Sequence, residues 1–253
     1  MELTDNARAY RKKFFGEGDA PLATSDPDLV ERWENFAFDE VAGRDDIDDR
    51  TRFMCILAAL MGCQGRELFE QMVPAALAAG LSPIEIKEIV YQGVDYLGMG
   101  RVYPFVEIVN RALENEGISL PLESQSTTTM ATRLSAGIQA QVDIFGEGMR
   151  DFTKSGPEEK RHINVWLAGN CFGDFYTRTG LDLRERELIT FCFIAAQGGC
   201  EPQLTAHAAG NMQCGSDRLF LIGVVSQLVP YLGYPRSLNA LSCIDKAAEQ
   251  QKE

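Results

Sequence analysis

The sequence of 253 residues predicts an all-α fold composed of two tandem helical units. Three observations support this prediction. Apolar residues recur at helical spacing in segments that close on a glycine. No run of strand-length segments separated by tight turns is found in the sequence. Short matches also recur in the same order in the two halves of the chain, beginning with the tetrapeptide FGEG at residues 15–18 and again at 145–148.

The matches that follow FGEG indicate a tandem duplication. Arg52 aligns with Arg186 at an offset of 134, and Gln92 aligns with Gln227 at an offset of 135. The tripeptide YLG recurs at the second of these offsets. Such a small drift over most of each half is difficult to obtain by chance. A period of this length indicates two whole domains rather than a short structural repeat.

We place the border between the two units at residue 120. Unit one then spans residues 1–120 and unit two spans residues 121–253. The segment 121–130, PLESQSTTTM, is rich in Ser and Thr and contains one Pro, which is the composition of a linker. The two units are therefore expected to be helical domains joined by a short polar connection.

The first two helices predicted in unit one follow directly from apolar spacing. Segment 50–62 carries a buried stripe, and Gly62 is expected to end the helix. Segment 67–80 is expected to close at Gly80, because glycine readily adopts the left-handed conformation that follows a helix. Pro74 is expected to mark the start of this second helix or a kink within it.

The third helix of unit one, over 82–98, has the clearest start signal in the chain. Ser82 and Glu85 have the spacing of a capping box. Unit two repeats the three-helix plan, with Ser216 expected to cap its third helix. The corresponding segments of unit two are 184–199, 201–215 and 216–233.

Composition excludes several classes of function. The net charge of −13 disfavours binding to phosphate backbones, so nucleic acid is not expected as a partner. No stretch of about 18 uncharged apolar residues predicts a membrane span, and the polar N-terminus predicts a cytoplasmic protein. The seven Cys form no CxxC pair and are expected to be reduced thiols, and no ligand spacing predicts a metal site.

Residues 172–215 contain an ordered set of features. These are an aromatic segment, a Gly-Leu-Asp turn, an Arg-Glu-Leu helix start, a Leu-x-x-His on the next helix and a closing Gly. This order resembles the carboxymuconolactone decarboxylase family, which shares its fold with alkyl hydroperoxidase D. Residues 48–60 and 80–98 of unit one carry the same frame more weakly. The resemblance implies two tandem alkyl hydroperoxidase D-like domains, without a cofactor.

The resemblance implies that His207 is a catalytic residue, because it occupies the position of the family's motif His. An unperturbed imidazole titrates near neutral pH, so it can donate and accept protons there. The alternative is a buried His that bonds only to a backbone carbonyl. Unit one has Met72 at the equivalent position. Because a thioether cannot transfer protons, unit one is expected to carry a degenerate site.

Cys200 and Glu187 are the other two catalytic candidates. The peroxidase branch of the family carries Cys-x-x-Cys-x-x-x-His, and this frame contains Cys200 here but has Gln203 at the second Cys. Cys200 is interpreted either as a nucleophile or as a small residue in a tight turn. Glu187 could join a proton relay with His207 or only favour its helix N-terminus, and Glu201 is an alternative neighbour of His207.

Candidate substrate-binding residues are cationic, aromatic or amide-bearing. Arg178 and Arg186 could each clamp a carboxylate, or could make structural ion pairs. Phe172 and Tyr176 could line a pocket, or could belong to the core. Gln203, in place of the second Cys, completes the candidate set.

Three hypotheses remain open from the sequence. The first is a decarboxylase-like enzyme that acts on a small cyclic or unsaturated acid and uses an imidazole as general acid/base. The second is a thiol-dependent peroxidase, and the third is a non-catalytic binding or assembly protein of the same fold. The resemblance also implies a homo-oligomer, either a trimer of tandem chains or a dimer.

Overall fold

The structure is a computed structural model that describes residues 2–44 and 46–251. It confirms the all-α fold, since the described residues form helices and turns without a strand. The elements of the first half are α1 (Asp5–Phe15), α2 (Pro27–Asn35), the π-helix η1 (Phe36–Val41), η2 (Ala42–Arg44), α3 (Asp49–Cys63), α4 (Arg66–Ala78), α5 (Pro83–Leu97) and α6 (Met99–Asn115).

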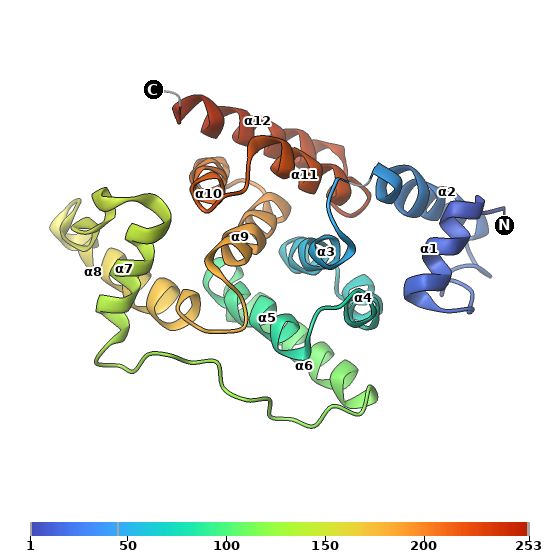
Figure 1. The fold of residues 1–253 in the computed structure, drawn as a ribbon, viewed down its shortest axis with the longest axis horizontal. Coiled ribbons are helices and arrows are strands. Elements are labelled where there is room, and N and C mark those ends of the chain that lie inside the picture. The colour runs from blue at the N-terminus through green and yellow to red at the C-terminus, as the bar shows by residue number, and fades with distance from the viewer. Residues whose placement is uncertain (1, 45, 252–253) are drawn as a thin grey trace.

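The second half begins after a linker and has a similar order of longer helices, with three short turns inserted between its first two helices. Its elements are α7 (Arg133–Phe145), the short turns η3 (Glu147–Met149), η4 (Phe152–Lys154) and η5 (Glu158–Lys160), α8 (Arg161–Trp166), the π-helix η6 (Leu167–Tyr176), α9 (Leu183–Gln197), α10 (Glu201–Gln213), α11 (Arg218–Leu232) and α12 (Tyr234–Gln250). Figure 1 shows α3 and α9 at the centre, with α12 along one edge and the linker along the opposite edge.

The repeated sequence motifs have the same structure in both halves. The two FGEG copies end α1 and α7, and their first glycines, Gly16 and Gly146, have φ values of 79° and 90°. The two YLG copies end α5 and α11, where Gly98 and Gly233 have φ values of 80° and 75°. Glycine is required at these helix ends because other residues rarely adopt positive φ.

Helices α3 and α9 pack against each other inside a single hydrophobic core that includes side chains from both halves. The core packing is tight where the two helices meet. A Cβ atom added to Gly62 of α3 would lie 2.6 Å from both the Ala196 Cβ and the Phe193 carbonyl oxygen of α9. Because one core serves both units, the border at residue 120 stays a prediction from sequence.

The sequence predicts that Gly62 ends its helix, and this prediction is wrong. Helix α3 continues to Cys63, and the left-handed residue after it is Gln64, with φ of 63°. Gly62 instead permits the close approach of α9. Ser216 is also not the cap of α11, because the Asp217 carboxylate accepts the hydrogen bond of Phe220 N at 2.7 Å. The capping box at Ser82 and Glu85 and the closing role of Gly80 are confirmed.

Two hydrogen bonds between an arginine and a glutamine connect the units. The residues of one bond are the duplication counterparts of the residues of the other. Gln92 of unit one accepts a hydrogen bond from Arg186 Nη1 of unit two at 2.8 Å. Its counterpart Gln227 of unit two accepts from Arg52 Nε of unit one at 2.9 Å. Both arginines and both glutamines are buried. The duplication is therefore repeated in the contacts between the units as well as in the sequence.

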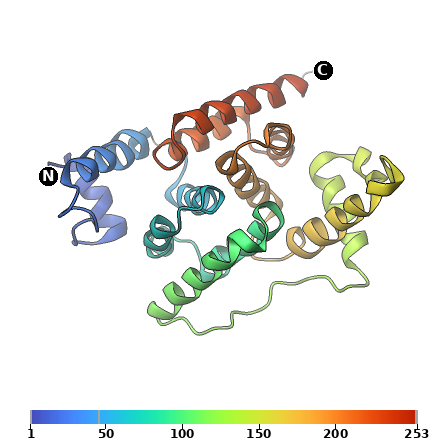
Figure 2. The ribbon, with the colours of Figure 1, turned by 180° about the vertical axis from the view of Figure 1, so that it is seen from behind.

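The linker is an extended segment that leaves α6 and runs along the outside of both units to reach α7. Figure 2 shows this path from behind, along the lower edge of the molecule. Thr127 Oγ1 donates to the Thr177 carbonyl at 2.8 Å, and Thr128 Oγ1 donates to the Gly173 carbonyl at 2.9 Å. Within the described residues, no helix combines the length and the apolar character needed to cross a membrane.

Candidate active site

Helices α9 and α10 bring Glu187 and His207 together. Helix α9 starts with a capping box, in which the Asp182 carboxylate accepts from Glu185 N at 2.8 Å. Asn211, one turn after His207 on α10, fixes the two helices relative to each other. Its side-chain amide donates to the Glu187 carbonyl at 2.8 Å and to the His207 carbonyl at 2.9 Å. The backbone positions of both candidate residues are thereby set by one side chain.

His207 Nδ1 lies 2.9 Å from Glu187 Oε2. The Glu187 side chain is fully buried, whereas 11% of the His207 side chain is exposed. Of the alternatives left open by sequence, the structure places Glu187 rather than Glu201 against the imidazole. Among the described residues, His207 Nε2 has no hydrogen-bond partner.

Buried hydroxyl groups surround the other oxygen of Glu187. Tyr176 OH donates to Glu187 Oε1 at 2.8 Å and lies 2.8 Å from Thr190 Oγ1. Tyr96 OH of α5 lies 2.9 Å from Tyr176 OH. Cys171 Sγ lies 3.6 Å from Tyr96 OH. Unit one therefore contributes Tyr96 to this network, beside side chains from unit two.

The donors in this network point toward the Glu187 carboxylate. The Nε2 group of Gln92 can only donate, and it does so to Thr190 Oγ1 at 2.8 Å, so the Thr190 proton is directed to Tyr176. Burial raises the pKa of the Tyr176 and Tyr96 phenols well above the ordinary value, which keeps both protonated. The Tyr176 hydroxyl thus donates its proton to Glu187 and accepts hydrogen bonds from Thr190 and Tyr96.

A carboxylate that accepts at both oxygens holds the imidazole in one tautomer. Glu187 Oε1 receives the Tyr176 proton, so Oε2 is left to accept from His207 Nδ1. The proton of the neutral imidazole then resides on Nδ1, and Nε2 keeps its lone pair. When His207 is protonated, the second N–H proton is on Nε2, and Glu187 Oε2 still accepts from Nδ1. The arrangement can therefore both take and give a proton at Nε2.

Aromatic rings and one glycine shape the surroundings of the imidazole. Tyr96 and Phe145 each contact His207 edge-on, with ring centroids 5.5 Å away. Gly210 leaves room for the carboxylate, because a Cβ atom at this position would lie 2.5 Å from Glu187 Oε2 and 2.8 Å from a Phe145 ring carbon. The Glu187–His207 pair thus depends on a small residue one turn along α10.

Asp95, next to Tyr96 on α5, is a titratable group that sequence reasoning missed. Its Oδ2 atom is buried without a hydrogen-bond partner among the described residues. Burial, aided by the nearby negative charge of Asp174, raises the pKa of Asp95 to about 7. Asp174 itself pairs with Arg133, at an N–O distance of 3.2 Å.

Cys200 occupies the residue before α10, and His207 lies two turns further along the same helix. This spacing corresponds to about 10 Å along the helix axis, which is too far for a hydrogen bond between the two side chains. The Cys200 thiol instead accepts from Gln197 Nε2 at 3.3 Å. Gln203 is exposed on α10, one turn before His207 and on the same side of the helix.

The aromatic candidates are buried in the structure. Phe172 packs against the rings of Tyr176 and Phe145, with centroids 4.6 Å and 6.0 Å away. Tyr176 is 2% exposed, and its hydroxyl is directed at Glu187. Phe172 therefore supports the rings beside His207, and Tyr176 reaches the imidazole only through the carboxylate.

Both candidate arginines bind Glu88 of α5. Arg178 Nε and Nη2 bind the Glu88 carboxylate at 2.8–3.0 Å, and Arg186 Nη2 binds Glu88 Oε2 at 3.0 Å. Arg186 is fully buried, and it also donates to the carbonyls of Arg178 and Thr179. Neither arginine bonds to Glu187 or His207. Of the two interpretations of these residues, the geometry matches structural ion pairs between the units.

Tyr96, Thr190 and Gln92 are site residues that the sequence did not reveal. Tyr96 belongs to the YLG repeat and Gln92 is one of the matched positions, so both had been noticed only as signs of duplication. Their part in the site depends on the crosswise packing of α5 against α9 and η6, which no spacing within one segment encodes.

The equivalent place in unit one is filled by apolar side chains. Met72, at the His207 position, is 1% exposed in the core. Phe53, at the Glu187 position by the offset of 134, is 1% exposed, and its ring lies 4.9 Å from that of Phe14. Neither side chain can transfer a proton, so unit one has kept the packing of this region without its acid–base groups.

Comparison with known families agrees with this pair of related units. The carboxymuconolactone decarboxylase family matches two segments, residues 27–110 and 165–246, which together make up more than half of the chain. The chain belongs to the carboxymuconolactone decarboxylase family. The second matched segment contains Tyr176, Glu187 and His207, and the first contains Met72. The family membership thus accounts for both units, including the one without a His.

One solved structure shares this fold over its whole length. It is a crystal structure from Burkholderia xenovorans LB400 described as that of a candidate gamma-carboxymuconolactone decarboxylase subunit. The similarity covers 98% of this chain and 97% of that chain, with a TM-score of 0.52 and 20% sequence identity. At this identity the similarity shows the fold alone. The comparison with curated proteins gives no match.

Proposed function

We propose that this family member is a cofactor-free, decarboxylase-like enzyme that acts on a small cyclic or unsaturated carboxylic acid. His207 is the general acid/base, and Glu187 orients its imidazole ring and stabilises the imidazolium form. The observation that supports the proposal most strongly is the 2.9 Å contact between His207 Nδ1 and a fully buried Glu187, with Nε2 making no hydrogen bond to the described residues. A carboxylate–imidazole pair of this kind is suited to proton transfer at neutral pH.

The chemistry follows from what decarboxylation leaves behind. When the bond between the carboxylate carbon and the carbon skeleton breaks, CO₂ departs and the electron pair remains on the skeleton as an extended enolate. The imidazolium of His207 donates its Nε2 proton to a carbon of this enolate, and the imidazole later regains a proton from solvent. The Glu187 carboxylate stabilises the imidazolium that exists before the transfer.

The remaining candidate residues divide into two roles. Gln203, exposed beside His207 on α10, is proposed to hydrogen-bond the substrate. Tyr176 and Phe172 are positioning residues, because they contact Glu187 and the ring of Phe145 rather than open space. Arg178 and Arg186 are proposed to hold the two units together through Glu88, so they are not assigned to the substrate of His207.

A thiol-dependent peroxidase is the alternative activity, and Cys200 decides between the two. That reaction needs Cys200 close to an activating base, and the structure places it two turns from His207. We expect purified protein to release CO₂ from small unsaturated lactone acids, and we expect Cys200→Ser to leave this kcat unchanged. Consumption of an organic hydroperoxide is measured on the same samples. Loss of both activities in Cys200→Ser, with the fold intact, would instead identify Cys200 as the reactive group.

A further inference from the structure

A cavity of about 200 Å³ lies between helix α5 and the linker, away from His207. We call it the linker cavity and define it by its lining residues. These are Ile84, Lys87, Glu88 and Tyr91 of α5, Leu122, Glu123, Ser124 and Gln125 of the linker, and Arg178. None of these residues hydrogen-bonds to Glu187 or His207. On α5 the lining ends at Tyr91, more than one turn before Tyr96, which contacts the imidazole.

The walls of the linker cavity are held in place. Its α5 residues lie at helical spacing on one side of that helix. The linker is attached to the turn that carries Arg178, since Thr179 N donates to the Gln125 carbonyl at 3.0 Å. The turn is packed closely against α5 at Gly180, where a Cβ atom would lie 2.9 Å from an Ile84 side-chain carbon. The cavity is therefore a pre-formed hollow rather than a gap under a loose strand.

Two polar groups of the lining have protons left to donate, the Arg178 guanidinium and the Ser124 hydroxyl. Arg178 uses Nε and Nη2 to bind both oxygens of Glu88, which leaves Nη1 without a partner among the described residues. Glu88 is 1% exposed and is fully engaged by Arg178 and Arg186, so its charge is neutralised within the protein. The Ser124 hydroxyl also lines the cavity and has a free proton to donate.

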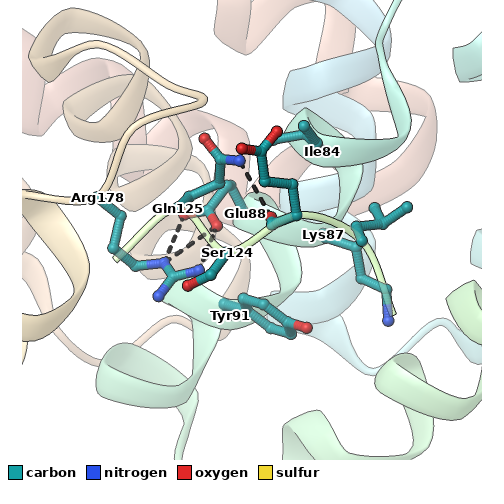
Figure 3. Close-up of a pocket in the computed structure, with 9 residues that line it drawn as sticks. Ile84, Lys87, Glu88, Tyr91, Ser124, Gln125 and Arg178 are labelled. Carbon is teal, nitrogen blue, oxygen red and sulfur yellow. Dashed lines mark hydrogen bonds and ion pairs between the residues drawn. The ribbon is translucent and has the colours of Figure 1, made fainter. Parts of the chain in front are cut away.

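Two cationic side chains of the lining lie near the aromatic ring of Tyr91. Arg178 Cζ lies 5.4 Å from the centre of the Tyr91 ring, and Lys87 Nζ lies 5.7 Å from it. Figure 3 shows Arg178 and Lys87 on opposite sides of Tyr91 in that view, with Ser124 between Arg178 and the ring. The lining contains two cations, Arg178 and Lys87, and two carboxylates, Glu88 and the exposed rim residue Glu123. The lining thus carries no net negative charge, although the chain as a whole has a net charge of −13.

The size and the apolar part of the lining restrict the ligand further. The cavity has the volume of roughly six or seven water molecules and falls below the range that holds drug-sized compounds. Ile84, Leu122 and the Tyr91 ring supply apolar contact. A ligand that satisfies these features has one carboxylate and a compact, flat apolar body.

We propose that the linker cavity is a second binding site, which takes a small organic carboxylate such as an aromatic or unsaturated monoacid. Its carboxylate accepts hydrogen bonds from Arg178 Nη1 and Ser124 Oγ, and its apolar body lies among Ile84, Leu122 and Tyr91. The linker wall, 122–125, lies outside both segments that match the family. The site thus arises from the way this chain joins its two units, and it does not depend on the activity proposed for His207.

The test uses sodium benzoate as the probe and the neutral, isosteric benzamide as its comparison, with binding followed by isothermal titration calorimetry. Ser124 is exposed at the edge of the cavity, so Ser124→Phe fills the cavity without disturbing a buried residue. Ser126→Phe is the matched control, because Ser126 is exposed on the same linker and does not line the cavity. Circular dichroism establishes that each variant is folded.

We expect one benzoate per chain in the wild type, in Ser126→Phe and in His207→Ala. Binding is expected to be at least about tenfold weaker for benzamide and for Ser124→Phe, because the charge-assisted hydrogen bonds or the space itself are lost. Equal binding of benzoate to both linker variants, equal binding of benzoate and benzamide, or no benzoate binding would overturn the proposal. Benzoate binding that is retained in His207→Ala does not depend on the site at His207. A failure of the proposed decarboxylation can therefore be distinguished from a failure of the linker-cavity proposal.

Discussion

His207→Ala is expected to lower kcat for decarboxylation by about 10²- to 10⁴-fold, the usual contribution of a positioned acid/base group. The reason is local. Within the part of the chain that the structure describes, Nε2 is the nitrogen of His207 that makes no hydrogen bond, and alanine removes it. Glu187 keeps the hydrogen bond from Tyr176, so the fold should survive the change. The rate of CO₂ release gives kcat, and circular dichroism verifies the helical content.

The chain offers a matched control for this experiment, because it contains only two histidines. His162 is exposed on α8 and packs edge-on against Trp166, and it makes no hydrogen bond to Glu187 or His207. His162→Ala should leave kcat at the wild-type value. If the two variants have equal kcat, His207 is not the acid/base and the proposed mechanism is wrong.

Arg186→Met is expected to reduce the free energy of unfolding by about 3–5 kcal/mol, which is typical for breaking one side of a buried ion pair. The fully buried guanidinium binds Glu88, Gln92 and two backbone carbonyls. Methionine fills a similar volume, but it leaves these acceptors without their donors. The loss should appear in urea denaturation followed by circular dichroism.

Arg111→Met is the surface comparison for Arg186→Met. Arg111 pairs with Glu70 at 3.1 Å, and the side chains of both residues are more than half exposed. Exposed pairs of this kind contribute at most about 1 kcal/mol. A loss in Arg186→Met as small as that in Arg111→Met would show that the Glu88–Arg186 contact does not hold the units together.

The fold was largely accessible from the sequence because its signals are local. The glycines of FGEG and YLG, and the capping box at Ser82, act within one turn of helix and need no partner from elsewhere in the chain. Where tertiary packing overrides a local signal, the prediction was wrong. Gly62 has the residue type of a helix end, yet it is needed at the contact with α9, and the helix runs past it.

The candidate site was only partly accessible, since its residues come from both units. His207 and Glu187 stand on adjacent helices of unit two, and a motif with fixed spacing could point to them. Tyr96 and Gln92 join them only because α5 of unit one packs across α9. The duplication revealed which arginine and glutamine correspond, but only the structure shows that each arginine bonds to the glutamine of the other unit.

The most direct test of the central claim is the tautomer of the neutral His207 ring, read from ¹⁵N NMR at alkaline pH. In a His162→Gln variant, His207 is the single imidazole of the chain, so its signals need no assignment. The account predicts the proton on Nδ1, held by Glu187, with an unprotonated Nε2. A proton on Nε2 in the neutral ring would contradict it, because Glu187 would then not be orienting the imidazole for proton transfer.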